Sequence, residues 1–228
     1  MNIAIIPARI GSKRIKEKNL KKFCNKPAIY WTIKELKKTK LFEKIIVSTD
    51  SIKLANLAKF YGAEVPFMRP KKLAGDFVST SDVVRHAIKW LDKNKIQSKY
   101  VCCAYPCAVF IDSKDIKKGY TQLKKKKSEY VFSAASVAES IYRSFYFKKN
   151  HLKMMFPKNY DYRTQDLTNL FIDAGQFYWG LKDTWLNKNK IFTKESSIVN
   201  IPRYKYVDID TIEDWKFAEK LAKINTKF

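Results

Sequence analysis

The chain has 228 residues, with 46 lysines and arginines against 22 aspartates and glutamates, and a formal net charge of +24. That length suits one domain that buries its core without disulfides, and because the lysines are spread along the whole chain, the charge favours solubility over nucleic-acid binding. The apolar run at the start is too short for a signal peptide and no later window could span a membrane, so we expect a cytoplasmic protein with no membrane partner.

The first predicted element is a buried strand at residues 3–6, and a basic loop follows it. The loop runs to residue 19 and holds one glycine, one serine and the cations Arg9, Lys13, Arg14, Lys16 and Lys18. In an open α/β sheet the ligand binds beyond the carboxyl ends of the strands, so a loop of this charge suits a phosphate chain. The loop is neither a Walker A sequence nor Gly-x-Gly-x-x-Gly, which counts against P-loop kinases and dinucleotide oxidoreductases.

The next elements alternate between helix and strand. Pro27 is expected at the first position of a helix, and a strand at 44–48 follows. Ser51 and its two predecessors form a capping group for a helix at 52–61, and a short strand is expected at 64–67. This β-α-β-α-β order predicts a parallel sheet with right-handed crossovers.

The middle of the chain continues the same pattern. A capping group at 79–82 precedes a helix, a strand follows at 100–105, Asp112 caps another helix, and a strand is expected at 130–137. The strand at 100–105 contains Cys102 and Cys103. With Cys24 and Cys107 they suit reduced core thiols better than disulfides or a zinc site.

The pattern then breaks at residues 140–156. Polar and aromatic residues alternate there and the chain turns at 149–150, which predicts an antiparallel hairpin. Its aromatic density is too high for a hairpin in solvent, so we expect this segment, at about 138–170, to pack on a partner subunit.

A pair of aspartates precedes the last predicted helix. After a core strand at 173–180, a short helix at 184–187 and a strand at 198–201, Asp208 and Asp210 stand two residues apart on an extended segment before a final helix. They project to the same side and repel each other unless a cation lies between them. Taken alone, such a pair is more often a solvated strand end or an N-cap for the following helix than a metal site.

Four motifs occur in order along the chain: Pro-Ala-Arg-x-Gly-Ser-Lys-Arg-Ile-x-x-Lys-Asn from residue 7, Ile-Ile-Val-Ser-Thr-Asp from residue 45, Arg-Pro-x-x-Leu-Ala-x-Asp from residue 69 and Val-Asp-Ile-Asp-Thr-x-Glu-Asp from residue 207. Together they resemble the CMP-sialic acid synthetase family, whose members activate eight- or nine-carbon 2-keto sugar acids with CTP. The resemblance implies an α/β, Rossmann-like, doubly wound and mostly parallel sheet forming one nucleotidyltransferase domain over 1–228. It also implies an inserted dimerisation hairpin, a homodimer and Mg²⁺.

Within the family, the chain most resembles the branch that activates pseudaminic acid, whose product serves surface-glycan or flagellin glycosylation. The residues that carry this likeness lie at 140–145, 163–167 and 173–175. Where sialic acid enzymes have Gln-Pro-Thr-Ser-Pro and Arg-Pro-Asn-Gly, this chain has Tyr-Pro-Cys-Ala-Val and Ile-Asp-Ala-Gly. A pocket with fewer polar groups fits a deoxy, N-acylated sugar acid.

Other readings stay open. Legionaminic, N-acetylneuraminic or 3-deoxy-octulosonic acid could be the substrate. From other classes, the chain could be a basic nucleic-acid-binding α/β module or a sugar-1-phosphate nucleotidyltransferase, although the first loop lacks the glycines of the latter.

Carried over by position, the resemblance assigns three sets of residues. The nucleotide-binding set is Arg9, Gly11, Ser12, Lys18, Asn19, Arg69, Asp76 and Thr80. The substrate-binding set is Tyr105, Arg143, Arg163, Gln165, Asp173 and Gln176. The metal ligands are Asp208 and Asp210, and with Arg9 and Lys18 they form the catalytic set.

Some of these residues also have plain structural roles. Thr80 could cap a helix, Tyr105 could be a core aromatic residue, and Arg143 could lie over an aromatic ring. The expected reaction is in-line attack of the sugar's C2 hydroxyl on the α-phosphorus of CTP, with release of diphosphate. Such a reaction requires positioning and charge neutralisation, and no motif for a covalent intermediate is present.

Overall fold

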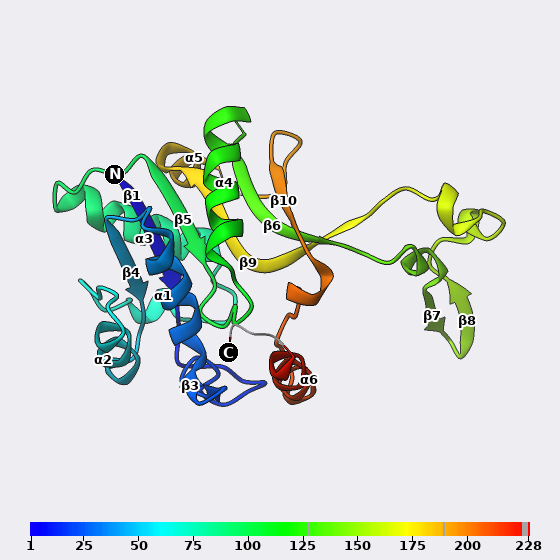
Figure 1. Ribbon diagram of the computed structural model, residues 1–228, viewed down its shortest axis with the longest axis horizontal. Helices are drawn as coiled ribbons and strands as arrows, with labels where there is room; N and C mark the ends of the chain where they lie inside the picture. The colour runs from blue at the N-terminus through cyan, green and yellow to red at the C-terminus, as the bar shows by residue number, and fades with distance from the viewer. Residues whose placement is uncertain (127, 189, 225–227) are drawn as a thin grey trace.

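In the computed structural model, which describes residues 1–126, 128–188, 190–224 and 228, a six-stranded sheet has the order β10-β6-β9-β5-β1-β4 (Figure 1). Its strands are β1 (Asn2–Pro7), β4 (Lys44–Ser48), β5 (Tyr100–Ala104), β6 (Tyr130–Ser136), β9 (Phe171–Leu181) and β10 (Ser197–Ile201). Strand β1 pairs in parallel with β4 and β5, and β10 pairs in parallel with β6. Only β9 runs antiparallel, against β5 and β6, among the described strands of this sheet. The mostly parallel α/β fold predicted from the sequence is confirmed.

Helices cover both faces of the sheet. The helices are α1 (Ala28–Thr39), α2 (Ile52–Phe60), α3 (Thr80–Lys93), α4 (Ser113–Lys126), α5 (Lys182–Asn187) and α6 (Ile212–Lys223). Helices α1, α2 and α4 contribute to the cluster on one face, and α3 and α5 contribute to the cluster on the other. This two-sided cover explains why the strands are apolar on both faces.

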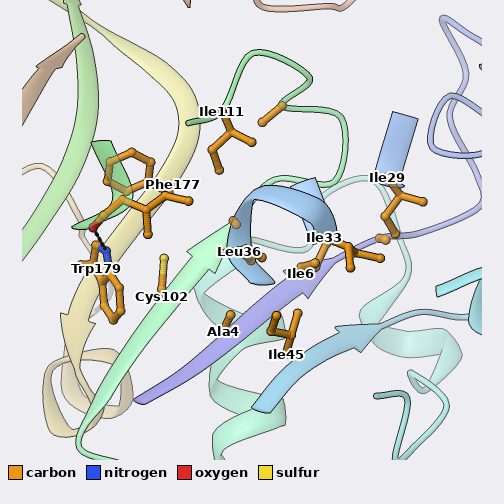
Figure 2. Close-up of a cluster of buried hydrophobic side chains, with 14 of the residues drawn as sticks. Ala4, Ile6, Ile29, Ile33, Leu36, Ile45, Cys102, Ile111, Phe177 and Trp179 are labelled. Atoms are coloured by element: carbon orange, nitrogen blue, oxygen red, sulfur yellow. Dashed lines mark hydrogen bonds between the residues drawn. The ribbon is translucent and has the colours of Figure 1, made fainter. Parts of the chain in front are cut away.

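Strand β1 shows how the two faces are filled. Ala4 and Ile6 belong to the cluster with α1 and α4, whereas Ile3 and Ile5 belong to the cluster with α3, and all four are fully buried. Figure 2 shows the first cluster, in which Ile33 and other side chains of α1 lie over β1. Each such buried isoleucine stabilises the fold by about 1.5–3 kcal/mol.

The helix starts follow the predicted capping groups. The side chain of Ser51 accepts a hydrogen bond from the Leu54 amide, and Ser79 does the same for Asp82. Helix α6 begins with a capping box formed by Thr211 and Asp214. These bonds satisfy amides that have no partner within the helix.

Two local predictions are wrong. Pro27 is the N-cap of α1 and not its first helical residue; it ends the short pair β2 (Lys22–Phe23) and β3 (Lys26–Pro27). Residues 64–67 form no strand: Glu64 makes a single bridge to Ile46 of β4, and the next bridge joins Met68 to Thr49, just after β4. Pro66 lies between the bridges and has no amide proton for a ladder.

The segment between β6 and β9 leaves the body of the protein. It carries the hairpin of β7 (Phe145–Lys148) and β8 (His151–Met154), which Figure 1 shows standing well apart from the sheet. Its turn residues Lys149 and Asn150 have φ of 49° and 64°, the left-handed geometry typical of a two-residue hairpin turn. The predicted hairpin is confirmed.

Short 3₁₀ segments occur at Lys71–Leu73, Glu139–Arg143, Pro157–Asn159, Thr164–Asp166 and Arg203–Lys205. The four cysteines are free, and burial raises the pKa of the Cys102 and Cys103 thiols, as expected for reduced core residues. In the part of the chain that the structure describes, no helix combines the length and apolarity needed to cross a bilayer.

Candidate active site

A cavity of about 610 Å³ opens beyond the carboxyl ends of β1 and β5. Four stretches line it: the basic loop after β1, residues 69–83, residues 105–110 and the strand segment 174–176, with residues 207–209 closing one side. Ligands of open α/β sheets bind at this edge. The position therefore agrees with the prediction from the sequence.

The basic loop presents its cations to one acidic residue. Arg9 Nη1 lies 2.7 Å from Asp76 Oδ1, and Lys13 Nζ lies 2.5 Å from Asp76 Oδ2. Hydrogen bonds from Lys13 and Arg9 hold the pKa of the Asp76 carboxyl below its usual value. An incoming phosphate chain would compete with Asp76 for these two cations.

Buried polar contacts fix the course of the loop. Asn19, which is buried, donates from Nδ2 to the Arg9 carbonyl at 3.0 Å. The Ile10 amide donates to Asp50 Oδ1, also at 3.0 Å. The loop backbone is therefore held in place before any ligand binds.

Arg69 is a buried cation in the cavity wall. Its Nε donates to Ser48 Oγ at 3.1 Å and its Nη2 donates to the Ser48 carbonyl. Burial lowers the pKa of the guanidinium to about 10, against the attraction of Asp50. Nearby, Thr80 Oγ1 lies 3.0 Å from the Tyr105 hydroxyl, so these two predicted residues meet in the structure.

Asp208 and Asp210 flank a buried isoleucine. Ile209 is 2% exposed and packs in the cluster with Phe23, Phe110 and Trp215, so the alternation of the chain turns both carboxylates away from that core. Burial, and then the charge of Asp210, raise the pKa of Asp208. The two carboxylates are thus close enough to repel each other.

Cations of the loop contact this pair. Arg14 Nη2 lies 2.7 Å from Asp210 Oδ1, Lys18 Nζ lies 3.6 Å from the same oxygen, and Lys18 also donates to the Ile209 carbonyl. No group of three or more His, Cys, Asp or Glu side chains able to hold a metal occurs in the described ranges. Two carboxylates without a full protein cage fit Mg²⁺, which keeps waters and binds together with substrate phosphates.

Strand β9 forms the floor of the cavity. Gly175 has φ of +60°, and its amide donates to Asp173 Oδ1 at 3.1 Å. Asp173 Oδ2 accepts from the Tyr178 hydroxyl at 2.6 Å, and burial raises the pKa of this carboxyl. Gln176, the next residue after the glycine, lines the cavity.

The structure brings most of the predicted residues together. The predicted residues that line the cavity are Arg9, Ser12, Lys18, Asn19, Arg69, Asp76, Thr80, Tyr105, Gln176 and Asp208. Gly11 is exposed on the loop beside them, Asp210 contacts two lining cations, and Asp173 lies behind the floor.

Three predicted substrate residues lie elsewhere in this chain. Arg143 donates to the carbonyls of Tyr160 and Tyr162, at 2.5 and 2.8 Å, and its Cζ lies 5.9 Å from the Tyr160 ring centroid. Arg163 pairs with Asp166 at 2.8 Å, and Gln165 is exposed in the same segment. Because the segment after β6 leaves the body, none of the three reaches the cavity of its own chain.

The structure also adds residues that the sequence did not single out. Lys205 Nζ lies 2.8 Å from both Asp112 Oδ2 and Asp115 Oδ2, and the Lys205 carbonyl accepts from Gln176 Nε2 at 2.6 Å. These contacts link the start of α4 to the cavity floor. They join residues far apart in the sequence, so no local pattern could have revealed them.

Comparisons with known proteins bear on the family of the chain. The model of a family described as cytidylyltransferase matches residues 3–227. The pseudaminic acid cytidylyltransferase of Campylobacter jejuni is 38% identical over 225 residues, which cover 98% of this chain and 97% of that protein. The CMP-N,N'-diacetyllegionaminic acid synthase of Legionella pneumophila is 29% identical, over 98% of this chain and 97% of that protein.

A solved structure supports the fold. CMP:2-keto-3-deoxy-manno-octonic acid synthetase complexed with CTP superposes with a TM-score of 0.74, over 97% of this chain and 98% of that one. The two sequences share 13% identity, so this likeness concerns the fold alone.

Proposed function

The chain belongs to the cytidylyltransferase family, and from this premise we propose that it transfers the cytidylyl group of CTP to pseudaminic acid and releases diphosphate. The observation that carries the proposal is the cavity. It joins a cation-rich loop, a buried arginine and Asp208 at the sheet edge where nucleotides bind, and Asp210 contacts two of the lining cations. The 38% identity over nearly the full length of a pseudaminic acid cytidylyltransferase supports the choice of sugar acid.

The loop cations would neutralise the triphosphate. The C2 hydroxyl of the sugar acid releases its proton to solvent and its oxygen forms a new bond to the α-phosphorus. The bond from that phosphorus to the bridging oxygen breaks, and diphosphate leaves with the electron pair. Arg9 and Lys13 exchange Asp76 for phosphate oxygens, and Lys18 stabilises the charge that develops on the leaving group. The exchange costs little because all of these ion pairs are partly exposed.

Asp208 and Asp210 are the residues that would hold Mg²⁺. When bound, the ion supplies a Lewis acid that neutralises phosphate charge and favours ionisation of the attacking hydroxyl. Arg14 and Lys18, which contact Asp210 in this structure, would then turn to the phosphates. Nucleotide binding would therefore free Asp210 from its ion pairs with Arg14 and Lys18.

The nucleoside end would lie at Arg69 and Thr80. Arg69 is held by Ser48, and Thr80 by Tyr105, so their polar atoms are fixed in the wall. Because these side chains are already fixed in the cavity wall, they need not reorganise when the nucleotide binds. The sugar acid would then face Tyr105, Gln176 and the β9 floor.

We further propose that the protein acts as a homodimer through the hairpin of β7 and β8. Phe145, Phe147 and Leu152 are 57%, 76% and 58% exposed, respectively, a concentration of apolar surface that a second copy would cover. On this arrangement Arg143, Arg163 and Gln165 would serve the partner's cavity.

Diphosphate release from CTP and Mg²⁺ tests the function. Pseudaminic, legionaminic, N-acetylneuraminic and 3-deoxy-octulosonic acids are supplied in parallel reactions, and we expect release with pseudaminic acid. Release with legionaminic acid instead would keep the reaction and change the substrate, a candidate favoured by the 29% identity to a legionaminic acid synthase. No release with any acid would refute the proposal.

A further inference from the structure

Gln176 is held in the cavity floor by an irregular stretch of backbone. The pairing of β6 with β9 shifts register between Phe132 and Ala134, and Ser133 Oγ accepts the amides of both Gln176 and Phe177 at 3.3 Å. Such bulges re-aim side chains at the edge of a site. Here the kink begins at Gly175, directly before Gln176.

Almost every polar group of Gln176 is satisfied. Its carbonyl accepts the Tyr105 amide at 2.9 Å, its amide donates to Ser133, and its Nε2 donates to the Lys205 carbonyl at 2.6 Å. The remaining polar atom, Oε1, is buried and has no hydrogen-bond partner among the described residues. Leaving such an acceptor unmet costs more than a typical hydrogen bond contributes, so it calls for an explanation.

The orientation of this amide is determined by its neighbours. The Lys205 carbonyl can only accept, so the nitrogen end of the Gln176 side chain must face it and the oxygen end must face the other way. Lys205 is itself fixed, because its ammonium lies 2.8 Å from both Asp112 and Asp115. Gln176 is only 3% exposed and is among the residues that line the cavity, so the unmet acceptor belongs to a fixed residue of the cavity wall.

Apolar residues that are close in sequence to Gln176 and Lys205 also line the cavity. Ala174 lies two residues before Gln176, and Val207 lies two residues after Lys205; both line the cavity. A wall that combines an amide acceptor with apolar side chains matches an acylamino substituent, whose N–H donates while its alkyl end packs. A hydroxyl or a charged group would leave the apolar part of the wall without a partner.

Resting on the function proposed above, we propose that Gln176 determines specificity for the sugar acid by accepting a hydrogen bond, through Oε1, from the N–H of one acylamino group. The side chain contacts the sugar and not the nucleotide. Its hydrogen bond to the Lys205 carbonyl makes Asp112 and the buried Asp115, which hold the Lys205 ammonium, a support for this contact. A sugar acid without that N–H leaves the acceptor unmet and is rejected.

The test combines a variant with altered substrates. Gln176→Met removes the acceptor at similar volume, and analogues of pseudaminic acid replace one acylamino N–H at a time by an ester oxygen. For one analogue, kcat/KM of the wild type falls roughly 5- to 150-fold, the range expected for an unmet buried acceptor. With the natural substrate, kcat/KM of Gln176→Met falls by about the same factor. With that analogue kcat/KM of the variant falls no further, and its KM for CTP is unchanged.

Gln122→Met is the matched control. Gln122 Oε1 is also buried and has no partner among the described residues, but Gln122 does not line the cavity, so this variant should keep wild-type kinetics. The analogue experiment on the wild type requires no folded variant.

Three outcomes would overturn the inference. One is equal wild-type turnover of the natural substrate and all analogues. Another is a kcat/KM of Gln176→Met that falls further when the analogue replaces the natural substrate, so that the effects of variant and analogue add. The third is a rise in KM for CTP in that variant. Each of these leaves the proposed function standing, because the wild type still turns over pseudaminic acid. Absence of wild-type turnover with any sugar acid would overturn the function and this inference together.

Discussion

Replacing Asp210 by asparagine should separate catalysis from folding. The variant loses the ion pairs to Arg14 at 2.7 Å and to Lys18 at 3.6 Å, and half of the carboxylate pair with Asp208. Arg14 and Asp210 are 66% and 36% exposed, so losing the pairs should change the free energy of unfolding by less than about 1 kcal/mol. The Asp210 amide keeps its bond to Asp214, which preserves the start of α6.

The effect on turnover should be much larger. Losing one group that organises charge in a preorganised site costs about 2–4 kcal/mol of barrier, or about 100- to 1000-fold in kcat. Diphosphate release at saturating CTP and sugar acid measures the rate, and urea denaturation measures stability. Raising the Mg²⁺ concentration should recover part of the loss if the missing carboxylate had contributed to binding the ion.

Asp92→Asn is the matched control. Asp92 pairs with Lys182 at 2.7 Å and is 38% exposed, so the charge, distance and exposure resemble those of Asp210 while the pair lies outside the cavity. This variant should show the same small change in stability and wild-type turnover. Wild-type turnover in Asp210→Asn itself, at limiting Mg²⁺, would refute the assignment of the carboxylate pair.

Three further changes test the fold, a buried carboxyl and the hairpin. A Cβ on Gly180 would lie 2.9 Å from both Trp185 Nε1 and the Tyr130 ring, so Gly180→Ala should lower the free energy of unfolding in urea by about 1–3 kcal/mol; no loss would mean that both rings can move aside. Burial raises the pKa of Asp173 above its ordinary 3.8, so between that value and the raised one the folded state holds a proton that the unfolded state has released. The contribution of Asp173 to stability should therefore fall as pH rises through that window, and Asp173→Asn should remove that contribution in urea titrations, leaving the part that comes from Asp208; an unchanged slope would assign all of it to other groups. Phe147→Lys should convert a dimer to monomer in sedimentation, and a wild type that is already monomeric would contradict the proposed assembly.

The sequence was informative wherever structure depends on near neighbours. The apolar run at 3–6, the capping side chains Ser51 and Ser79 and the turn at 149–150 all depend on residues within a few positions of one another, and all were predicted correctly. The strand expected at 64–67 failed because Pro66 removes a ladder hydrogen bond. The strand was predicted from the apolar residues of this segment, without regard to the missing amide proton of Pro66.

The site was predictable in its composition but not in its contacts. The basic loop, Arg69 and Asp208 meet in one cavity, as the motifs suggested. The side chain of Gln176 donates to the carbonyl of Lys205, 29 residues away. That contact depends on a register shift between β6 and β9, which the apolar periodicity of the sequence does not predict. Arg143, Arg163 and Gln165 were assigned to the substrate site from motifs alone, and a motif carries no information about how far a hairpin projects from the sheet.

The order of the sheet constrains how the chain can assemble during synthesis. Strand β9 lies between β5 and β6, which both precede it in the sequence, and the stretch that carries β7 and β8 must be made before β9 emerges (Figure 1). Until residue 181 has been translated, β5 and β6 each present an unpaired edge toward the gap, and Tyr105 and Ser133 lack their β9 partners. Strand edges left open in this way invite pairing with other chains. We therefore expect nascent chains truncated before β9 to aggregate, and the pocket floor to be among the last parts of the protein to form.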